Sequence, residues 1–272
     1  MRPWNIAHRG GAGLAPENTL AAFRDAVARG ADGAELDVQL SRDGLVVVHH
    51  DWRLMAHVAR QDGIWLAQPG PRIKDLTLAE LRGFDIGRAE PGSDYASAHP
   101  DVRRADGEHV PLLDEVIAAA KSSPSFHLLV ELKCDGSDDS ADPVALADAA
   151  LAVVRAADFL IRVIFVGFDW RALARVKQAA PEARCWFTTD RLARLGSPPL
   201  APLLETIKKM GGEGWFPNYE DATPAAIALA RALGLKLAAW TVNDPADMQR
   251  LASLDAICTD RPDLLQSLEQ RR

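Results

Sequence analysis

The sequence predicts an α/β fold built on a parallel sheet, and the pattern of the chain and its length point to it. Short apolar segments alternate with amphipathic segments from one end of the chain to the other, which is typical of repeated strand–helix units. Eight such units close a barrel. The chain has 272 residues, and barrels of this kind occupy about 250 residues as one domain. We therefore expect one barrel domain over residues 1–272.

Nine apolar runs are candidate strands, which is one more than a closed barrel of eight uses. They are Trp4–His8, Ala34–Val38, Leu45–His49, His127–Leu132, Val163–Val166, Arg184–Phe187, Gly214–Pro217, Lys236–Thr241 and Ala256–Cys258. We expect the last, around Ile257, to be the surplus strand, a short pairing near the closure of the barrel.

Amphipathic stretches between these strands are candidate helices. They include Thr19–Arg29, Leu113–Lys121, Val144–Ala157, Trp170–Ala179 and Pro224–Leu233. Thr19 is a suitable N-cap, Thr223 precedes a proline at the first helical position, and Gly234 is a stop signal.

One long segment, approximately residues 51–110, interrupts this rhythm. It shows no clear strand–helix unit and is rich in glycine, proline and charge, as in Pro69-Gly70-Pro71. A long segment of this kind in a compact domain is more often functional than idle. We expect an insertion after the third strand that forms a subdomain or lid.

Charge and composition exclude several classes of protein. The chain has 31 Lys and Arg against 38 Asp and Glu, a formal net charge of -7, so a nucleic-acid or anionic-membrane partner is not favoured. No apolar run approaches a membrane span, and the N-terminus has no signal-type apolar segment. The three cysteines are far apart and form no CxxC pair. These features predict a cytoplasmic protein.

Two carboxylates interrupt the second candidate strand. Glu35 and Asp37 point to one side of the strand, with Leu36 and Val38 on the other. Neighbouring carboxylates repel unless a proton, a cation or basic groups accompany them. Taken alone, such a pair on an exposed edge strand is usually solvated surface.

The ends of four candidate strands carry a set of residues that would meet at one mouth of a parallel barrel. They are His8, Glu35, Asp37, His50 and Glu131. Three carboxylates suit a hard cation, Mg²⁺ or Ca²⁺. Arg9 and Lys133 would hold an anion beside it, and two histidines suggest acid–base work on a phosphate ester.

The other histidines have simpler explanations. His50 beside Asp51 is also compatible with a structural hydrogen bond, and His49 should point to the opposite side and pack. We assign no role to the histidines at positions 57, 99, 109 and 127.

The order of short motifs along nearly the whole chain resembles the glycerophosphodiester phosphodiesterase family, in its bacterial cytoplasmic type. The motifs are His8-Arg9-Gly10, Pro16-Glu17-Asn18-Thr19, Glu35-Leu36-Asp37-Val38, His50-Asp51, Pro111-Leu112-Leu113-Asp114-Glu115-Val116, Glu131-Leu132-Lys133, Ala239-Trp240-Thr241-Val242-Asn243 and Thr259-Asp260-Arg261-Pro262. A departure is Gly167-Phe168-Asp169, where the family often has Ser-Phe.

The resemblance implies a TIM-type barrel that hydrolyses glycerophosphodiesters to sn-glycerol 3-phosphate and an alcohol, in glycerol and lipid metabolism. It implies a Mg²⁺ or Ca²⁺ ion on Glu35, Asp37 and Glu131, and an acid/base pair of His8 and His50. Substrate-binding positions that match are Arg9, Lys133, Glu17 and Trp240. Which histidine is the acid, and whether water or the glycerol 2-hydroxyl is the nucleophile, stay open.

Two other functions stay open as well. One is a lysophospholipase D-like activity on lipid substrates, and the other is a catalytically silent barrel that binds phosphodiesters. Trp52, Trp65 and Tyr95 in the insertion either line a pocket for the alcohol or pack the insertion's own small core.

Overall fold

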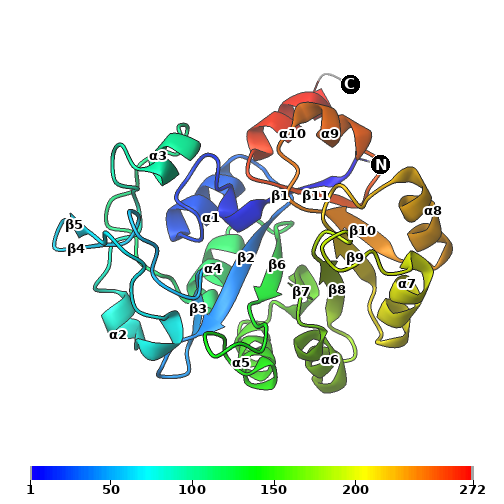
Figure 1. The fold of residues 1–272 in the computed structure, drawn as a ribbon, viewed down its shortest axis with the longest axis horizontal. Helices are drawn as coiled ribbons and strands as arrows, with labels where there is room; N and C mark the ends of the chain where they lie inside the picture. Colours follow the sequence, from blue (N-terminus) through cyan, green and yellow to red (C-terminus); the bar gives the residue numbers. More distant parts are fainter. Residues whose placement is uncertain (1, 271–272) are drawn as a thin grey trace.

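The computed structural model describes residues 2–270, and eight parallel strands in it close into a barrel (Figure 1). In their order around the ring the strands are β1 (Trp4–Ala7), β2 (Gly33–Leu40), β6 (His127–Leu132), β7 (Val163–Gly167), β8 (Arg184–Thr189), β9 (Gly214–Pro217), β10 (Lys236–Ala239) and β11 (Ala256–Thr259). The predicted fold class is confirmed.

Helices surround the barrel, and all but the last, α10, lie between successive strands of the ring (Figure 1). They are α1 (Leu20–Ala28), α4 (Leu113–Ala120), α5 (Pro143–Ala156), α6 (Trp170–Ala179), α7 (Leu200–Lys209), α8 (Pro224–Ala232), α9 (Pro245–Arg250) and α10 (Pro262–Gln270). The predicted caps are confirmed, because Thr19 and Thr223 each accept a hydrogen bond from the backbone three residues on. Gly234 follows α8 with φ +70°.

The surplus strand is β3 (Val46–Val48), so our expectation for the last strand is wrong. The strand β11 pairs with β1 over four residue pairs and also with β10, and it completes the barrel. In contrast, β3 pairs antiparallel with β2, with Val48 opposite Val38. A strand that returns through a short turn can pair only in this antiparallel way, and β3 therefore lies outside the ring.

Alternating side chains of the barrel strands form two layers. One set, including Leu36, Val130 and Phe165, is fully buried against the helices. The other set, including Ile6, Leu129 and Ile164, forms a separate cluster inside the barrel. Because apolar side chains fill the interior, the inward positions near the carboxyl ends of the strands are left for polar residues.

The chain between β3 and α4 contains β4 (Arg60–Gln61), β5 (Ile64–Trp65), α2 (Leu78–Leu81) and α3 (Asp94–Ala98), and lies beside the barrel (Figure 1). Its buried residues form an apolar cluster of their own, which includes Leu54, Ile73 and Leu81. We call this segment, residues 51–110, the insertion. No helix of residues 2–270 is long and apolar enough to cross a membrane.

Candidate active site

A tight turn directly after β1, the 3₁₀ turn His8–Gly10, supplies the first site residues. Arg9 and Gly10 have φ angles of +50° and +83°, in the left-handed region that disfavours residues with a Cβ. A Cβ on Gly10 would lie 2.7 Å from the Cβ of Ala22 in α1. Glycine is therefore required here, and the turn lets the Arg9 backbone N–H donate to Glu35 Oε2 at 3.1 Å.

Three carboxylates meet inside the mouth of the barrel. Oxygen atoms of Glu35, Asp37 and Glu131 lie within 4.8 Å of one another. Asp37 on β2 is the register partner of Glu131 on β6, so the parallel pairing of these strands places them side by side. Glu35 and Asp37 are 2% and 1% exposed. The alternative of an exposed edge strand is therefore wrong.

The two carboxylates of β2 have opposite electrostatic surroundings. Burial, together with the charges of Asp37 and Glu131, raises the pKa of Glu35 well above its usual value. Burial also opposes ionisation of Asp37, but the charges of Arg9, His50 and Lys133 outweigh it and hold the pKa of Asp37 low. Glu35 Oε1 is buried without a hydrogen-bond partner. The cluster thus contains one carboxylate that its protein neighbours do not neutralise.

His8 is oriented by an acidic residue from the other end of the chain. Its Nδ1 lies 2.6 Å from Asp260 Oδ1, and the second oxygen of Asp260 accepts from Asn243 Nδ2 at 2.6 Å. A carboxylate at Nδ1 favours a proton on that nitrogen. The Nε2 of His8, which lies 3.8 Å from Glu35 Oε2, is then the nitrogen that faces the carboxylate cluster.

His50 reaches the site by a different route from the one expected. It follows β3, which runs antiparallel to β2, so the hairpin and not a parallel strand end returns it toward Asp37. The backbone N–H of His49 donates to Asp37 O at 2.9 Å. His50 Nδ1 lies 2.6 Å from Asp51 Oδ1, which repeats the arrangement of His8. His49 is buried, as predicted.

Lys133 and Arg9 place positive charge on both sides of the carboxylates. Lys133 Nζ lies 3.0 Å from Glu131 Oε1 and 3.8 Å from Asp37 Oδ1. Arg9 Nη1 donates to Glu17 Oε1 at 2.9 Å. Arg9 Nε lies 3.4 Å from Asp37 Oδ2, is buried, and makes no hydrogen bond. One donor of Arg9 is therefore still available inside the mouth.

We expected the aromatic residues of the insertion either to line a pocket for the alcohol or to pack within the insertion, and the structure shows both arrangements. Trp52 lies under the Lys133 ammonium, 5.8 Å from Nζ to the ring centre, and Tyr95 donates to Glu17 Oε2 at 3.1 Å. Trp65 packs within the insertion, where the guanidinium groups of Arg60 and Arg88 lie over its ring.

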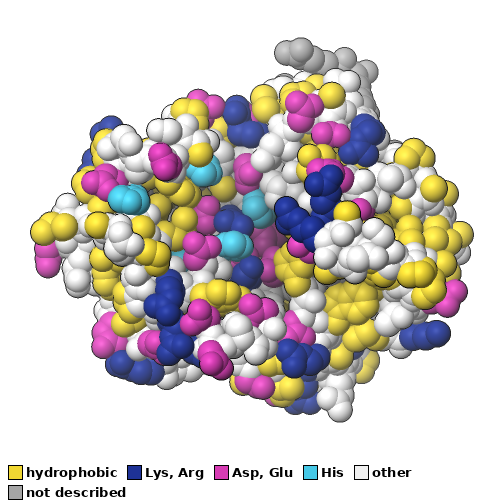
Figure 2. Space-filling model, viewed as in Figure 1, with side chains coloured by type: hydrophobic (Ala, Val, Ile, Leu, Met, Phe, Trp, Pro, Cys, Tyr) yellow, Lys and Arg dark blue, Asp and Glu magenta, His cyan; other side chains and the backbone are white. Residues whose placement is uncertain are grey.

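A cavity of about 280 Å³ lies among the side chains of His8, Arg9 and the carboxylate cluster. Its polar side contains His8, Arg9, Glu35, His50 and Glu131. Its apolar side contains Phe168, Phe216 and Trp240, and the Trp240 ring contacts Phe168 edge-on at 5.3 Å between centres. Figure 2 shows histidine, acidic and basic side chains gathered around a hollow in this face of the molecule. We call this space the barrel cavity.

Sequence reasoning assigned no role to three polar residues that support the site. Asp260 and Asn243 hold His8, and Asn18 Nδ2 donates to Asp37 Oδ2 at 2.8 Å. All three belong to the short motifs of the family resemblance, which was the available signal.

Comparisons with known proteins identify the family of the chain. The model of the glycerophosphoryl diester phosphodiesterase family matches residues 8–264. A glycerophosphodiester phosphodiesterase from Caldanaerobacter subterraneus subsp. tengcongensis is 31% identical, over 100% of this chain and 99% of the relative.

Two solved structures extend the comparison. A crystal structure from Silicibacter pomeroyi DSS-3 has a TM-score of 0.89 and 32% identity, and covers 98% of this chain and 92% of its own. An Oleispira antarctica phosphodiesterase, solved in complex with the product sn-glycerol-3-phosphate, has a TM-score of 0.77 and 27% identity, with 97% and 96% covered. The chain belongs to the glycerophosphoryl diester phosphodiesterase family and is an enzyme of that family.

Proposed function

We propose that this enzyme hydrolyses glycerophosphodiesters to sn-glycerol 3-phosphate and an alcohol, with the help of Mg²⁺ or Ca²⁺. The observation that carries the proposal is one cavity lined by His8, His50, Arg9, Glu35 and Glu131. Asp37 completes the carboxylate cluster beside it, and Lys133 Nζ lies 3.0 Å from Glu131 Oε1. The sn-glycerol-3-phosphate bound to the Oleispira antarctica phosphodiesterase supports the substrate class. On the family resemblance we also propose a cytoplasmic role in glycerol and lipid metabolism.

The carboxylate cluster fits a divalent cation. Glu35, Asp37 and Glu131 provide only oxygen ligands, as Mg²⁺ and Ca²⁺ prefer. The buried Glu35 Oε1 has no hydrogen-bond partner. A buried acceptor without a partner lowers the stability of the fold unless a proton or a cation binds to it. A bound cation supplies neutralisation and polarisation of the phosphoryl group.

Arg9 and Lys133 bind the phosphate in this proposal. Both guanidinium and ammonium groups form charge-assisted hydrogen bonds with phosphate oxygens. Arg9 Nε is a buried donor without a hydrogen bond, and Glu17 fixes the other end of the same guanidinium. Trp240, with Phe168 and Phe216, offers an apolar wall to the carbon atoms of the glycerol group.

His8 and His50 are the general acid and base. Each has a carboxylate at Nδ1, so Nε2 is the nitrogen that exchanges a proton with the substrate. One histidine takes a proton from the nucleophile as the new P–O bond forms. The other gives a proton to the alkoxide as the old P–O bond breaks.

A coupled assay for sn-glycerol 3-phosphate tests the proposal. The purified protein is given glycerophosphocholine, glycerophosphoethanolamine and glycerophosphoglycerol, each with Mg²⁺, with Ca²⁺ or after exhaustive EDTA dialysis. We expect product with at least one diester and one cation, and its loss after dialysis. Undiminished turnover without metal would exclude the cation, and no product from any diester would exclude the activity.

A further inference from the structure

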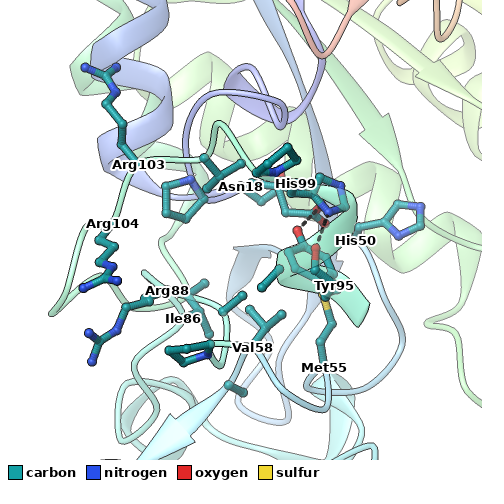
Figure 3. A pocket seen from close by; sticks show the side chains of 18 of the residues that line it. Asn18, His50, Met55, Val58, Ile86, Arg88, Tyr95, His99, Arg103 and Arg104 are labelled. Carbon is teal, nitrogen blue, oxygen red and sulfur yellow. Dashed lines mark hydrogen bonds between the residues drawn. The ribbon is translucent and has the colours of Figure 1, made fainter. Parts of the chain in front are cut away.

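A second cavity lies beside the barrel cavity, at the boundary between the insertion and the turn after β1 (Figure 3). It encloses about 240 Å³, and we call it the insertion cavity. Its apolar wall comes mainly from the insertion and includes Met55, Val58, Ala59, Ile86, Pro91 and Val102. His50 lines both cavities. The two cavities therefore adjoin at this histidine.

The polar groups at the inner end of the insertion cavity already have partners. Tyr95 donates to Glu17, and Asn18 donates to Asp37. The Nδ1 atoms of His49 and His99 lie 2.9 Å from backbone carbonyls. A polar group that entered would replace only part of its hydrogen bonds to water, whereas an apolar group would gain contacts with the wall.

The outer end of the insertion cavity is positively charged. In Figure 3, Arg88, Arg103 and Arg104 lie on the side away from His50 and Tyr95. Arg103 forms an ion pair with Asp25, and Arg88 Nε lies 3.1 Å from Asp106 Oδ1. Arg104 has no ion pair among the described residues. Because two of the three arginines are paired with acidic side chains, the net positive charge at this end comes from Arg104, and it disfavours cationic groups.

We propose that the insertion cavity is the subsite for the leaving alcohol and that it selects alcohols with an apolar, uncharged chain over cationic ones. The inference rests on the proposed hydrolysis. The nucleophile's oxygen forms a bond to phosphorus, the bond from phosphorus to the alcohol oxygen breaks, and a proton from the general acid completes the alcohol. The glycerol phosphate half stays in the barrel cavity.

A series of sn-glycero-3-phosphate esters of methanol, butanol and hexanol tests the selection, with glycerophosphocholine as the cationic member. Burial of one CH₂ group favours binding about three- to fourfold. We expect kcat/KM to rise at least tenfold from the methyl to the hexyl ester, and the choline ester to fall below the butyl ester.

Filling the cavity supplies the matched variants. Ala96 of α3 lines the insertion cavity, whereas Ala98 of the same helix is exposed and is not part of its wall. Ala96→Phe should lower kcat/KM for the hexyl ester at least tenfold and change that for the methyl ester less than twofold. Ala98→Phe should change neither.

The outcomes separate the two proposals. If the wild-type enzyme cleaves the methyl ester but shows no preference for longer alcohols, or if Ala96→Phe affects both esters equally, the subsite is wrong and the hydrolysis stands. If the wild-type enzyme releases glycerol 3-phosphate from none of the esters, the proposed hydrolysis is wrong, and so is the proposed alcohol subsite.

Discussion

The barrel cavity and the insertion cavity adjoin at His50, yet their walls differ in charge and in hydrogen bonding. In the barrel cavity, charged side chains from several strands face one another, and Glu35 Oε1 and Arg9 Nε remain without hydrogen-bond partners. In the insertion cavity, the wall is mainly apolar and the polar groups at the inner end are paired. Charged groups without hydrogen-bond partners can bind and polarise a substrate. An apolar wall whose few polar groups are already hydrogen-bonded can distinguish ligands only by their size and polarity.

The largest expected effect comes from the histidines of the barrel cavity. His8→Ala and His50→Ala should each lower kcat about 10²–10⁴-fold, the usual contribution of one acid–base group. Because His50 borders the proposed alcohol subsite, we assign it as the acid that protonates the leaving group. With a 4-nitrophenyl ester, whose leaving group needs no proton, His50→Ala should recover most of its loss and His8→Ala should not.

The assay is steady-state release of glycerol 3-phosphate or 4-nitrophenol. His109→Ala is the control, since this histidine lies in the insertion and lines neither cavity. Near-normal turnover in either site variant would contradict its role. Recovery in His8→Ala instead would reverse the assignment of acid and base.

An intermediate effect is expected on stability without metal. The pKa of Glu35 is raised in the folded state, so above its ordinary value near 4.5 the ionised carboxylate destabilises the fold increasingly as pH rises. The pKa of Asp37 is lowered, so the stability that it contributes is present at neutral pH and is lost only as pH falls through acid values. Glu35→Gln should therefore raise Tm by about 2 °C or more at pH 7 in EDTA.

Thermal unfolding from pH 4.5 to 8 checks this difference. The gain from Glu35→Gln should shrink toward pH 4.5, and Mg²⁺ or Ca²⁺ should raise Tm of the wild-type protein more than that of the variant. Glu205→Gln, at an exposed position without such neighbours, should do neither. A lower Tm for Glu35→Gln at pH 7 in EDTA would show that the ionised Glu35 carboxylate does not destabilise the fold.

The smallest effect is expected at the contact between the two regions. Tyr95→Phe removes the hydrogen bond from the insertion to Glu17, while Glu17 keeps Arg9 as its partner. The free energy of unfolding should fall by about 0.5–1.5 kcal/mol, with a loss of kcat/KM of a few-fold. Denaturant unfolding and the same assay measure both, with Tyr219→Phe as the control. A loss as large as that of a histidine variant would mean that the insertion positions Arg9 for catalysis.

Much of the barrel cavity could be predicted from the sequence, because side chains two residues apart in a strand lie on the same face of the sheet. Glu35 and Asp37 on the inner side and Leu36 and Val38 on the outer side follow directly from it. Asp260 could not be assigned to His8 in the same way, since 252 residues separate them and only closure of β11 on β1 brings them together.

The insertion was predictable as a break in pattern and little more. Its short elements contain 2–5 residues each, which is too short for periodicity to show. The direction of β3 was equally hidden, because an apolar run of three valines reads the same in a parallel or an antiparallel strand.

The sequence by itself determined the fold class, the inward carboxylates and the family, since these depend on local alternation and on short motifs. Tertiary structure alone decided which strand lies outside the ring, which acid holds His8, and that an apolar cavity adjoins His50. Each of these depends on contacts between segments far apart in the chain, where residue pattern carries no information about the partner.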